Sequence, residues 1–132
     1  MNSGPDRLTI PAPAKINLFL DILGKRPDGY HELRSLVVPV SLADEVSLAR
    51  TDGAIEVTCD GADLPEGQAG RVPAGADNLA ARAAGHLRAA TGFRGGARIH
   101  IRKRIPVGGG MGGGSADAAA VLVGANALWE TG

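Results

Sequence analysis

The residues best suited to chemistry lie in one glycine-rich segment late in the sequence. Six of its eleven residues are glycine. Without Cβ atoms the backbone amides can approach a ligand closely, and the helix expected to follow adds free amides and a partial positive charge. This combination predicts a cradle for an anion, most commonly a phosphate chain. The residues expected to wrap the phosphates are Pro106, Val107, Gly108, Gly109, Gly110, Met111, Gly112, Gly113, Gly114, Ser115 and Ala116.

Other readings of this segment fit its context less well. A flexible linker would carry Ser, Thr or Gln among its glycines and would join domains, whereas this segment joins an expected strand to an expected helix. A P-loop requires lysine after its last glycine, and a protein-kinase loop joins two strands. The dinucleotide fingerprint should follow the first strand of its unit, but several strands precede this segment.

Two polar residues begin the helix that follows the glycines. Ser115 can cap the helix or direct its hydroxyl at a phosphate or at Mg²⁺, so it is a candidate metal ligand. Asp117 is expected in the first turn, where the helix dipole favours a carboxylate even without a ligand.

A second candidate site lies near the N-terminus. Lys15, one of three lysines, enters an apolar strand, and strand alternation places Asn17 on the same face. The Lys15 ammonium could neutralise a phosphate or a developing alkoxide. The alternative is a lysine at a strand edge whose charged end reaches water.

An aromatic residue and an imidazole follow the turn at residues 24–29. Tyr30 and His31 should project from this turn, where they could stack on a nucleobase and hydrogen-bond to its edge. An ordinary surface pair is the alternative.

A basic strand end carries Arg98, His100, Arg102, Lys103 and Arg104. A solvated face is the simple interpretation, and a nucleic-acid surface is the alternative, although no aromatic residues interleave with the charges. His86 is expected on the solvent side of a helix and Cys59 in the core at a strand end.

Apolar periodicity predicts the elements that position these residues. Strands are expected over residues 7–12, 16–23, 32–40, 45–48, 55–59 and 96–103. Turn residues at 51–53 predict a hairpin between the fourth and fifth of these strands. A helix capped by Asp77 or Asn78 is expected to run to about residue 91, and a second, mostly buried helix is expected over residues 115–129. The first should bury Leu79, Ala83, Leu87 and Ala90.

Composition restricts the class of protein. The 132 residues match one domain, and 44% are apolar, so a packed core is expected over residues 1–132. Fourteen basic and fourteen acidic residues give a net charge of zero, which provides no general attraction to nucleic acid or membrane. One cysteine, no apolar run of transmembrane length and no signal core in residues 1–7 lead us to expect a cytoplasmic protein.

Three segments together resemble the GHMP small-molecule kinases. They are residues 13–20, residues 26–33, and residues 105–119 with 126–129. The glycine segment indicates only this family, whereas the first two segments resemble its branch that phosphorylates the 2-hydroxyl of 4-diphosphocytidyl-2-C-methyl-D-erythritol in non-mevalonate isoprenoid synthesis. Other members, acting on homoserine or mevalonate, are the alternative, as is a nucleic-acid-binding α+β module.

The resemblance implies a fold, a cofactor and residue roles. The fold would be α+β, a mixed sheet with helices on one face and a βαβ unit with the glycine phosphate loop. The cofactors would be ATP and Mg²⁺, with residues 106–116 around the phosphates. Lys15 would act at the reacting hydroxyl with Asn17 beside it, while Tyr30 and His31 would hold the cytosine of a cytidine diphosphate substrate.

One departure from the family bears on activity. Its catalytic aspartate lies in a Gly-Ala-Asp-Val-Pro-like segment, which these 132 residues do not contain, and its second domain is also missing here. The resemblance therefore implies an N-terminal, ATP-binding part of a bacterial kinase that is inactive without the C-terminal part.

Overall fold

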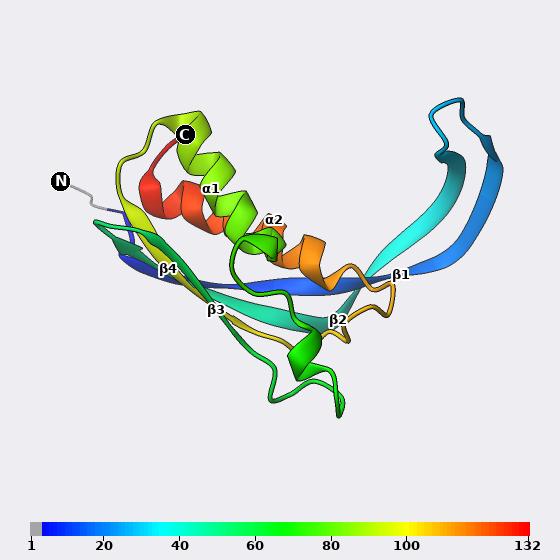
Figure 1. Cartoon of the computed structure of the whole chain (residues 1–132), viewed down its shortest axis with the longest axis horizontal. Helices are drawn as coiled ribbons and strands as arrows, with labels where there is room; N and C mark the ends of the chain where they lie inside the picture. Colours follow the sequence, from blue (N-terminus) through cyan, green and yellow to red (C-terminus); the bar gives the residue numbers. More distant parts are fainter. Residues whose placement is uncertain (1–3) are drawn as a thin grey trace.

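A mixed four-stranded sheet carries two helices on one of its faces (Figure 1). The computed structural model describes residues 4–132. The prediction that residues 1–7 contain no signal core therefore lies partly outside the described residues. The strands are β1 (Arg7–Lys25), β2 (His31–Thr51), β3 (Ile55–Asp60) and β4 (Gly96–Arg102). The helices are α1 (Leu79–Thr91) and α2 (Gly113–Trp129), with short 3₁₀ turns η1 (Ala69–Arg71) and η2 (Gly75–Asp77). The α+β expectation, with helices on one face, is confirmed.

The strand order is β1-β2-β4-β3. Strand β4 pairs antiparallel with β2 and parallel with β3, so β3, α1 and β4 form a βαβ unit, and the glycine segment follows it. The predicted hairpin between residues 45–48 and 55–59 is therefore wrong, because β4 lies between these strands. A turn signal marks where the chain reverses, but the choice of neighbouring strand depends on long-range packing.

Strands β1 and β2 are longer than predicted, because each merges two expected strands. Their register shifts between Pro13 and Lys15, where Lys15 pairs with Pro39, and such bulges let a long ribbon bend. Strand β1 tolerates Pro11 and Pro13 because it lies at the edge of the sheet. An edge strand has a neighbouring strand on one side only, so a proline, which lacks an N–H, can be accommodated there.

The core lies between the sheet and the two helices. Alternate residues of β2 and β4 point into it, among them Val46, Leu48, Ile99 and Ile101, all at most 1% exposed. Helix α2 packs closely because Gly124 faces the sheet: a Cβ there would lie 2.7 Å from Leu48 Cδ1.

Both helices bury faces somewhat different from those predicted. Helix α1 buries Ala80 and Ala84, whereas Leu79 is 44% exposed and Ala90 is also exposed, so the stripe is rotated by about one residue. Helix α2 buries one face only and leaves Val123 64% exposed. His86 is exposed as expected, but the prediction of a core Cys59 is wrong, because its strand lies at the sheet edge and its side chain is exposed.

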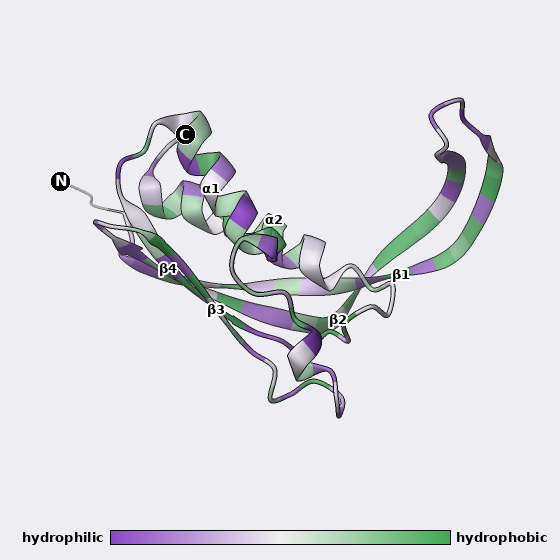
Figure 2. Cartoon of the chain, in the orientation of Figure 1, coloured by the Kyte–Doolittle hydropathy of each residue, from purple (hydrophilic) through white to green (hydrophobic). Residues whose placement is uncertain are grey.

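The outer halves of β1 and β2, residues 16–38, form a two-stranded arm that curves away from the rest of the sheet (Figure 1). Apolar residues continue along it (Figure 2). Their side chains are exposed because no helix or third strand among residues 4–132 covers this ribbon. The large exposed ones are Ile16, Leu18, Phe19, Leu20, Ile22, Leu23, Leu33, Leu36 and Val37. Within residues 4–132, no helix has the length and apolar character needed to cross a membrane.

Candidate functional site

The glycine loop, residues 106–112, lies between the end of β4 and the start of α2. Gly108, Gly110 and Gly112 have φ of 76°, 72° and 71°, a region that residues with a Cβ rarely adopt. Within the described residues, none of the amides from Gly108 to Ser115 donates to a protein acceptor, and the first bond of the helix runs from Ala116 N to Gly112 O at 2.9 Å. Free amides beside a helix start are the local geometry that the predicted anion cradle requires.

Neighbouring segments hold the glycine loop from both sides. The Lys15 amide of β1 donates to Met111 O at 3.0 Å. On the other side, the Val107 amide donates to Gln68 Oε1 at 2.7 Å, and this glutamine immediately precedes η1. The loop is therefore fixed at two points while its other amides stay free.

A cavity of about 300 Å³ lies beside the glycine loop. Residues 106–114 line it, whereas the exposed Ser115 and the half-buried Ala116 do not. Seven further lining residues lie outside the predicted phosphate-binding set: Val72, Pro73, Asn78, Leu79, Lys103, Ile105 and Asp117. The cavity thus combines an apolar wall with the polar loop, as small-molecule sites generally do.

Lys15 and Asn17 lie together next to the glycine loop. Lys15 Nζ donates to Asn17 Oδ1 at 2.6 Å, and Asn17 Nδ2 donates to Ser35 Oγ at 2.6 Å. A Cβ at Gly112 would lie 3.3 Å from Lys15 Cγ, so the lysine stem packs on the loop itself. The structure thus brings two segments about ninety residues apart in the sequence into one site.

Lys103 forms a buried hub beneath the glycine loop. Its Nζ donates to Asp44 Oδ2 at 2.5 Å and to Asp117 Oδ2 at 2.8 Å, and the side chains of all three residues are at most 6% exposed. Asp44 Oδ1 also accepts from the amides of Arg104 and Ile105. The hub therefore ties β2 and the start of the loop to the helix that follows the loop.

The hub corrects two sequence interpretations. Lys103 does not belong to a solvated basic face, and Asp117 lies in the second turn of α2, where it pairs with lysine rather than with the helix dipole. The strand alternation could have indicated this burial. Lys103 lies on the same face of its predicted strand as the buried Ile99 and Ile101, and Asp44 lies on the same face as the buried Val46. Charged residues in phase with buried positions are usually paired.

Burial and mutual charge shift the pKa values of the hub in different directions. Burial raises the pKa of Asp117 to about 7, although the Lys103 ammonium opposes the shift. Burial alone would raise the pKa of Asp44, but Lys103 and the two backbone amides outweigh it and lower this pKa. Both carboxylates raise the pKa of Lys103 against the effect of its burial. One Asp117 oxygen, Oδ1, is buried without a hydrogen-bond partner.

Tyr30 and His31 lie at the tip of the arm, where the turn ends and β2 begins, and the arm curves away from the rest of the sheet (Figure 1). The tip is ordered by Asp28, which pairs with Arg26 at 2.6 Å and accepts from the Tyr30 amide at 3.0 Å, and the Arg26 guanidinium lies 5.9 Å from the Tyr30 ring. Tyr30 is 72% exposed. Lys15 pairs with Pro39 and Lys25 with His31, so ten strand residues, or roughly 30 Å of chain, separate Lys15 from the tip along β1.

Carboxylates partly neutralise the basic face of β4. Arg98 pairs with Glu56 at 3.4 Å, while Arg102 and Arg104 both reach Asp63, at 2.6 Å and 3.8 Å. This arrangement matches a solvated face better than a surface for nucleic acid, which needs unpaired positive charge. Among residues 4–132, no group of three or more His, Cys, Asp or Glu is placed to hold a metal ion.

Comparison with known proteins finds similarity to one family of kinases. Residues 78–132 match the model of the GHMP kinases N terminal domain. The 4-diphosphocytidyl-2-C-methyl-D-erythritol kinase of Pelotomaculum thermopropionicum is 50% identical over 126 residues, which are 95% of this chain and 41% of that protein. The chain thus spans about two-fifths of this relative's length.

Solved structures agree with the sequence matches. A crystal structure of 4-(cytidine 5'-diphospho)-2C-methyl-D-erythritol kinase superposes with a TM-score of 0.73 at 42% identity, covering 94% of this chain and 41% of that one. The homoserine kinase of Cytophaga hutchinsonii, at 23% identity, shares the fold with a TM-score of 0.63 over 97% of this chain and 37% of its own. The chain is therefore similar to the GHMP kinases, and residues 4–132 have the fold of the N-terminal domain of these kinases.

Proposed function

We propose that this chain binds MgATP on the glycine loop and forms the ATP-binding part of a kinase for 4-diphosphocytidyl-2-C-methyl-D-erythritol. The observation that carries the proposal is the row of free amides from Gly108 to Ser115 at the start of α2. A triphosphate is the biological ligand that best matches many amides, a helix start and a nearby lysine. The relatives named above support the choice of substrate.

The space around the loop supports the proposal of a bound triphosphate. Nothing lies within 4 Å of the position of a Cβ on Gly110, so the space beside this residue is open to a ligand. At Gly113, by contrast, a Cβ would lie 3.1 Å from Ile105 Cγ2, so the loop packs tightly against the protein behind it. Asn78 and Leu79 line the same cavity beyond the glycine loop, and this part of the cavity would hold the nucleoside.

Mg²⁺ would be held mainly by the phosphates of ATP. The described residues offer no cluster of acidic ligands, and the hub engages Asp117. Ser115 is exposed at the helix start, so its hydroxyl is the one predicted protein ligand. Such binding agrees with the general preference of Mg²⁺ for phosphate oxygens and water with few protein ligands.

Lys15 and Asn17 would position the substrate hydroxyl beside the phosphate cradle. The Lys15 ammonium would neutralise charge that develops during transfer, and its bond to Asn17 fixes the direction of the side chain. Tyr30 and His31, at the tip of the arm, would hold the cytosine through stacking and hydrogen bonding. ATP would supply the transferred phosphoryl group.

Whole-enzyme activity is proposed for a protein of the relatives' length, because the chain spans 41% of the Pelotomaculum relative. For these 132 residues the proposal is ATP binding in the cytoplasm, the setting expected from the single cysteine.

A substitution in the glycine loop tests whether this loop binds ATP. Gly110→Val requires an unfavourable positive φ and directs its side chain into the open space, so ATP binding should fall below detection in calorimetry. Gly92→Val is the matched control, because Gly92 has φ of 70° and an equally open Cβ position at the end of α1. It should lower the melting temperature similarly but leave ATP affinity unchanged. Unchanged affinity in Gly110→Val would refute the assignment of the cradle.

A further inference from the structure

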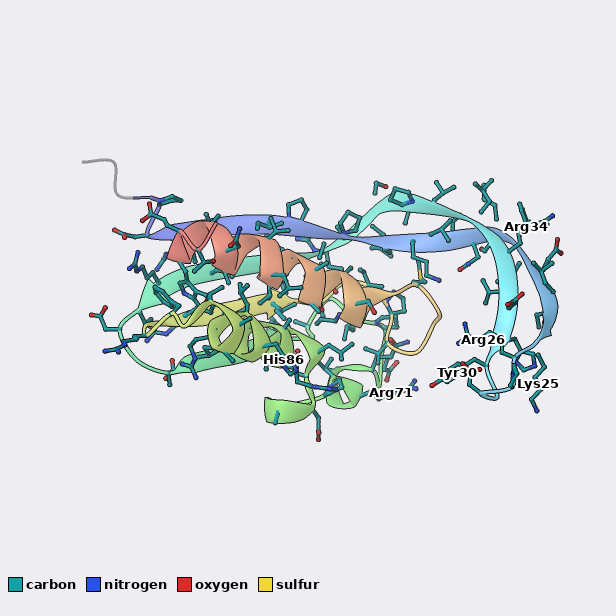
Figure 3. All side chains as sticks on the ribbon, turned by 90° about the horizontal axis from the view of Figure 1, so that it is seen from above. Lys25, Arg26, Tyr30, Arg34, Arg71 and His86 are labelled. Carbon is teal, nitrogen blue, oxygen red and sulfur yellow. The ribbon has the colours of Figure 1, made fainter. Side chains whose placement is uncertain are left out.

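The 3₁₀ turn η1 carries an arginine directly over the glycine loop. A Cβ at Gly108 would lie 3.1 Å from Arg71 Nη2. Figure 3 labels this side chain on the segment that leads from β3 to α1. Neither the apolar periodicity nor the motifs of the sequence single out Arg71, because it lies in a loop rich in glycine and proline.

Gln68 explains why the turn sits there. Its side-chain oxygen accepts from the Val107 amide at 2.7 Å, and its carbonyl accepts from the Arg71 amide at 2.9 Å. One residue thus docks the turn on the glycine loop and closes the turn that presents Arg71. The placement of the guanidinium is therefore built into the fold.

The charge of Arg71 has no protein partner. Within residues 4–132, its side chain donates to no acceptor and forms no ion pair, whereas the nearby Arg102 and Arg104 share Asp63. Lys15 lies against Gly112 at the other end of the same loop. Two cations therefore flank a row of free amides, and at the Arg71 end nothing in the described protein balances the positive charge.

We propose that Arg71 is a further phosphate-binding residue, whose guanidinium contacts non-bridging oxygens of a nucleoside triphosphate held on the glycine loop. The proposal rests on the proposed function of that loop. A guanidinium presents several N–H donors in a planar fork that matches phosphate oxygens, and its charge strengthens each hydrogen bond. Arg71 would bind the phosphates from the side opposite Lys15, so the substrate end of the site stays open.

Calorimetry on the 132-residue chain tests the role of Arg71, with ATP, inorganic tripolyphosphate and adenosine as ligands. Arg71→Ala should weaken ATP and tripolyphosphate about 10-fold to 100-fold, as expected for charge-assisted hydrogen bonds, and leave adenosine unchanged. Arg71→Lys should retain part of the affinity. Gln68→Ala should give an intermediate loss, because it frees the turn without removing the charge. Arg94→Ala, which removes an exposed arginine between α1 and β4, should change nothing.

The possible results separate this proposal from the function on which it rests. ATP binding by the unchanged chain with no loss in Arg71→Ala overturns the role of Arg71 alone. An equal loss for adenosine also overturns it, because the effect would then be a general one on the cavity. If the chain binds tripolyphosphate through Arg71 but does not bind ATP, the nucleotide assignment fails and the anion contact stands. If it binds neither ligand, both proposals fail.

Discussion

Lys103 Nζ lies 2.8 Å from Asp117 Oδ2, and this buried pair joins the last residues before the glycine loop to the helix that begins after it. Asp44 completes the hub from β2 and holds the amides of Arg104 and Ile105. Both ends of the loop are therefore anchored to the same ammonium group. This arrangement keeps the amides of the loop in place before any ligand arrives, so binding need not order the loop.

Removing the lysine should strongly destabilise the fold. Lys103→Met leaves two buried carboxylates without compensation, and the loss of one partner from a buried ion pair costs about 3–5 kcal/mol. Urea unfolding followed by circular dichroism measures this loss. Adding Asp117→Asn to the Lys103→Met variant should recover part of the stability, because it removes one uncompensated charge. No recovery in the double variant would contradict the hub.

The stability of the chain should depend on the ionisation of Asp117. Burial raises its pKa in the folded chain to about 7 from an ordinary value of 3.8, so the folded state binds the extra proton between these values. This contribution to stability is complete below about pH 4, declines as the pH rises and is lost above about pH 7. Asp117→Asn should therefore gain stability relative to the unchanged chain as the pH rises from about 4 to about 7, the range between the unfolded and folded pKa values of the carboxyl. A constant difference in unfolding free energy across that range would exclude the shift.

Tyr30 should contribute to binding of a cytidine nucleotide through its ring. Tyr30→Ala should weaken binding of the cytidine substrate by about 1–3 kcal/mol, the usual value for one stacked base. Tyr30→Phe keeps the ring and should bind nearly normally. Both substitutions are expected to leave stability almost unchanged, because the side chain is 72% exposed. Equal affinity for all three proteins in fluorescence titration would favour a family member with another substrate.

The 132-residue chain should not turn over ATP with the cytidine substrate. Lys15 donates to Asn17, and among residues 4–132 no carboxylate pairs with it. A general base near the accepting hydroxyl is therefore missing from the described site. Assay at high protein concentration should find the background rate only. Clear turnover dependent on Lys15 would show that these residues suffice for transfer.

Local patterns correctly predicted the elements that lie closest to the site. Helix α1 begins where Asn78 Oδ1 accepts from the Ala80 amide at 2.9 Å, and it ends at Gly92 with φ of 70°. Strand β4 follows the alternation of Ile99 and Ile101. The glycine loop lies between strand and helix as expected, because its conformation depends on residues within the loop itself.

The sequence by itself determined the secondary structure around the glycine loop and which faces are apolar, since these follow from neighbouring residues a few positions apart. Only the tertiary structure decided that β4 separates β2 from β3, that Lys15 and Arg71 flank one loop, and that Lys103 is buried between Asp44 and Asp117. The physical reason is that a periodic pattern specifies which way a side chain faces, whereas its partner depends on which distant segments pack together. A buried charge is stable only when those segments supply its counter-charge.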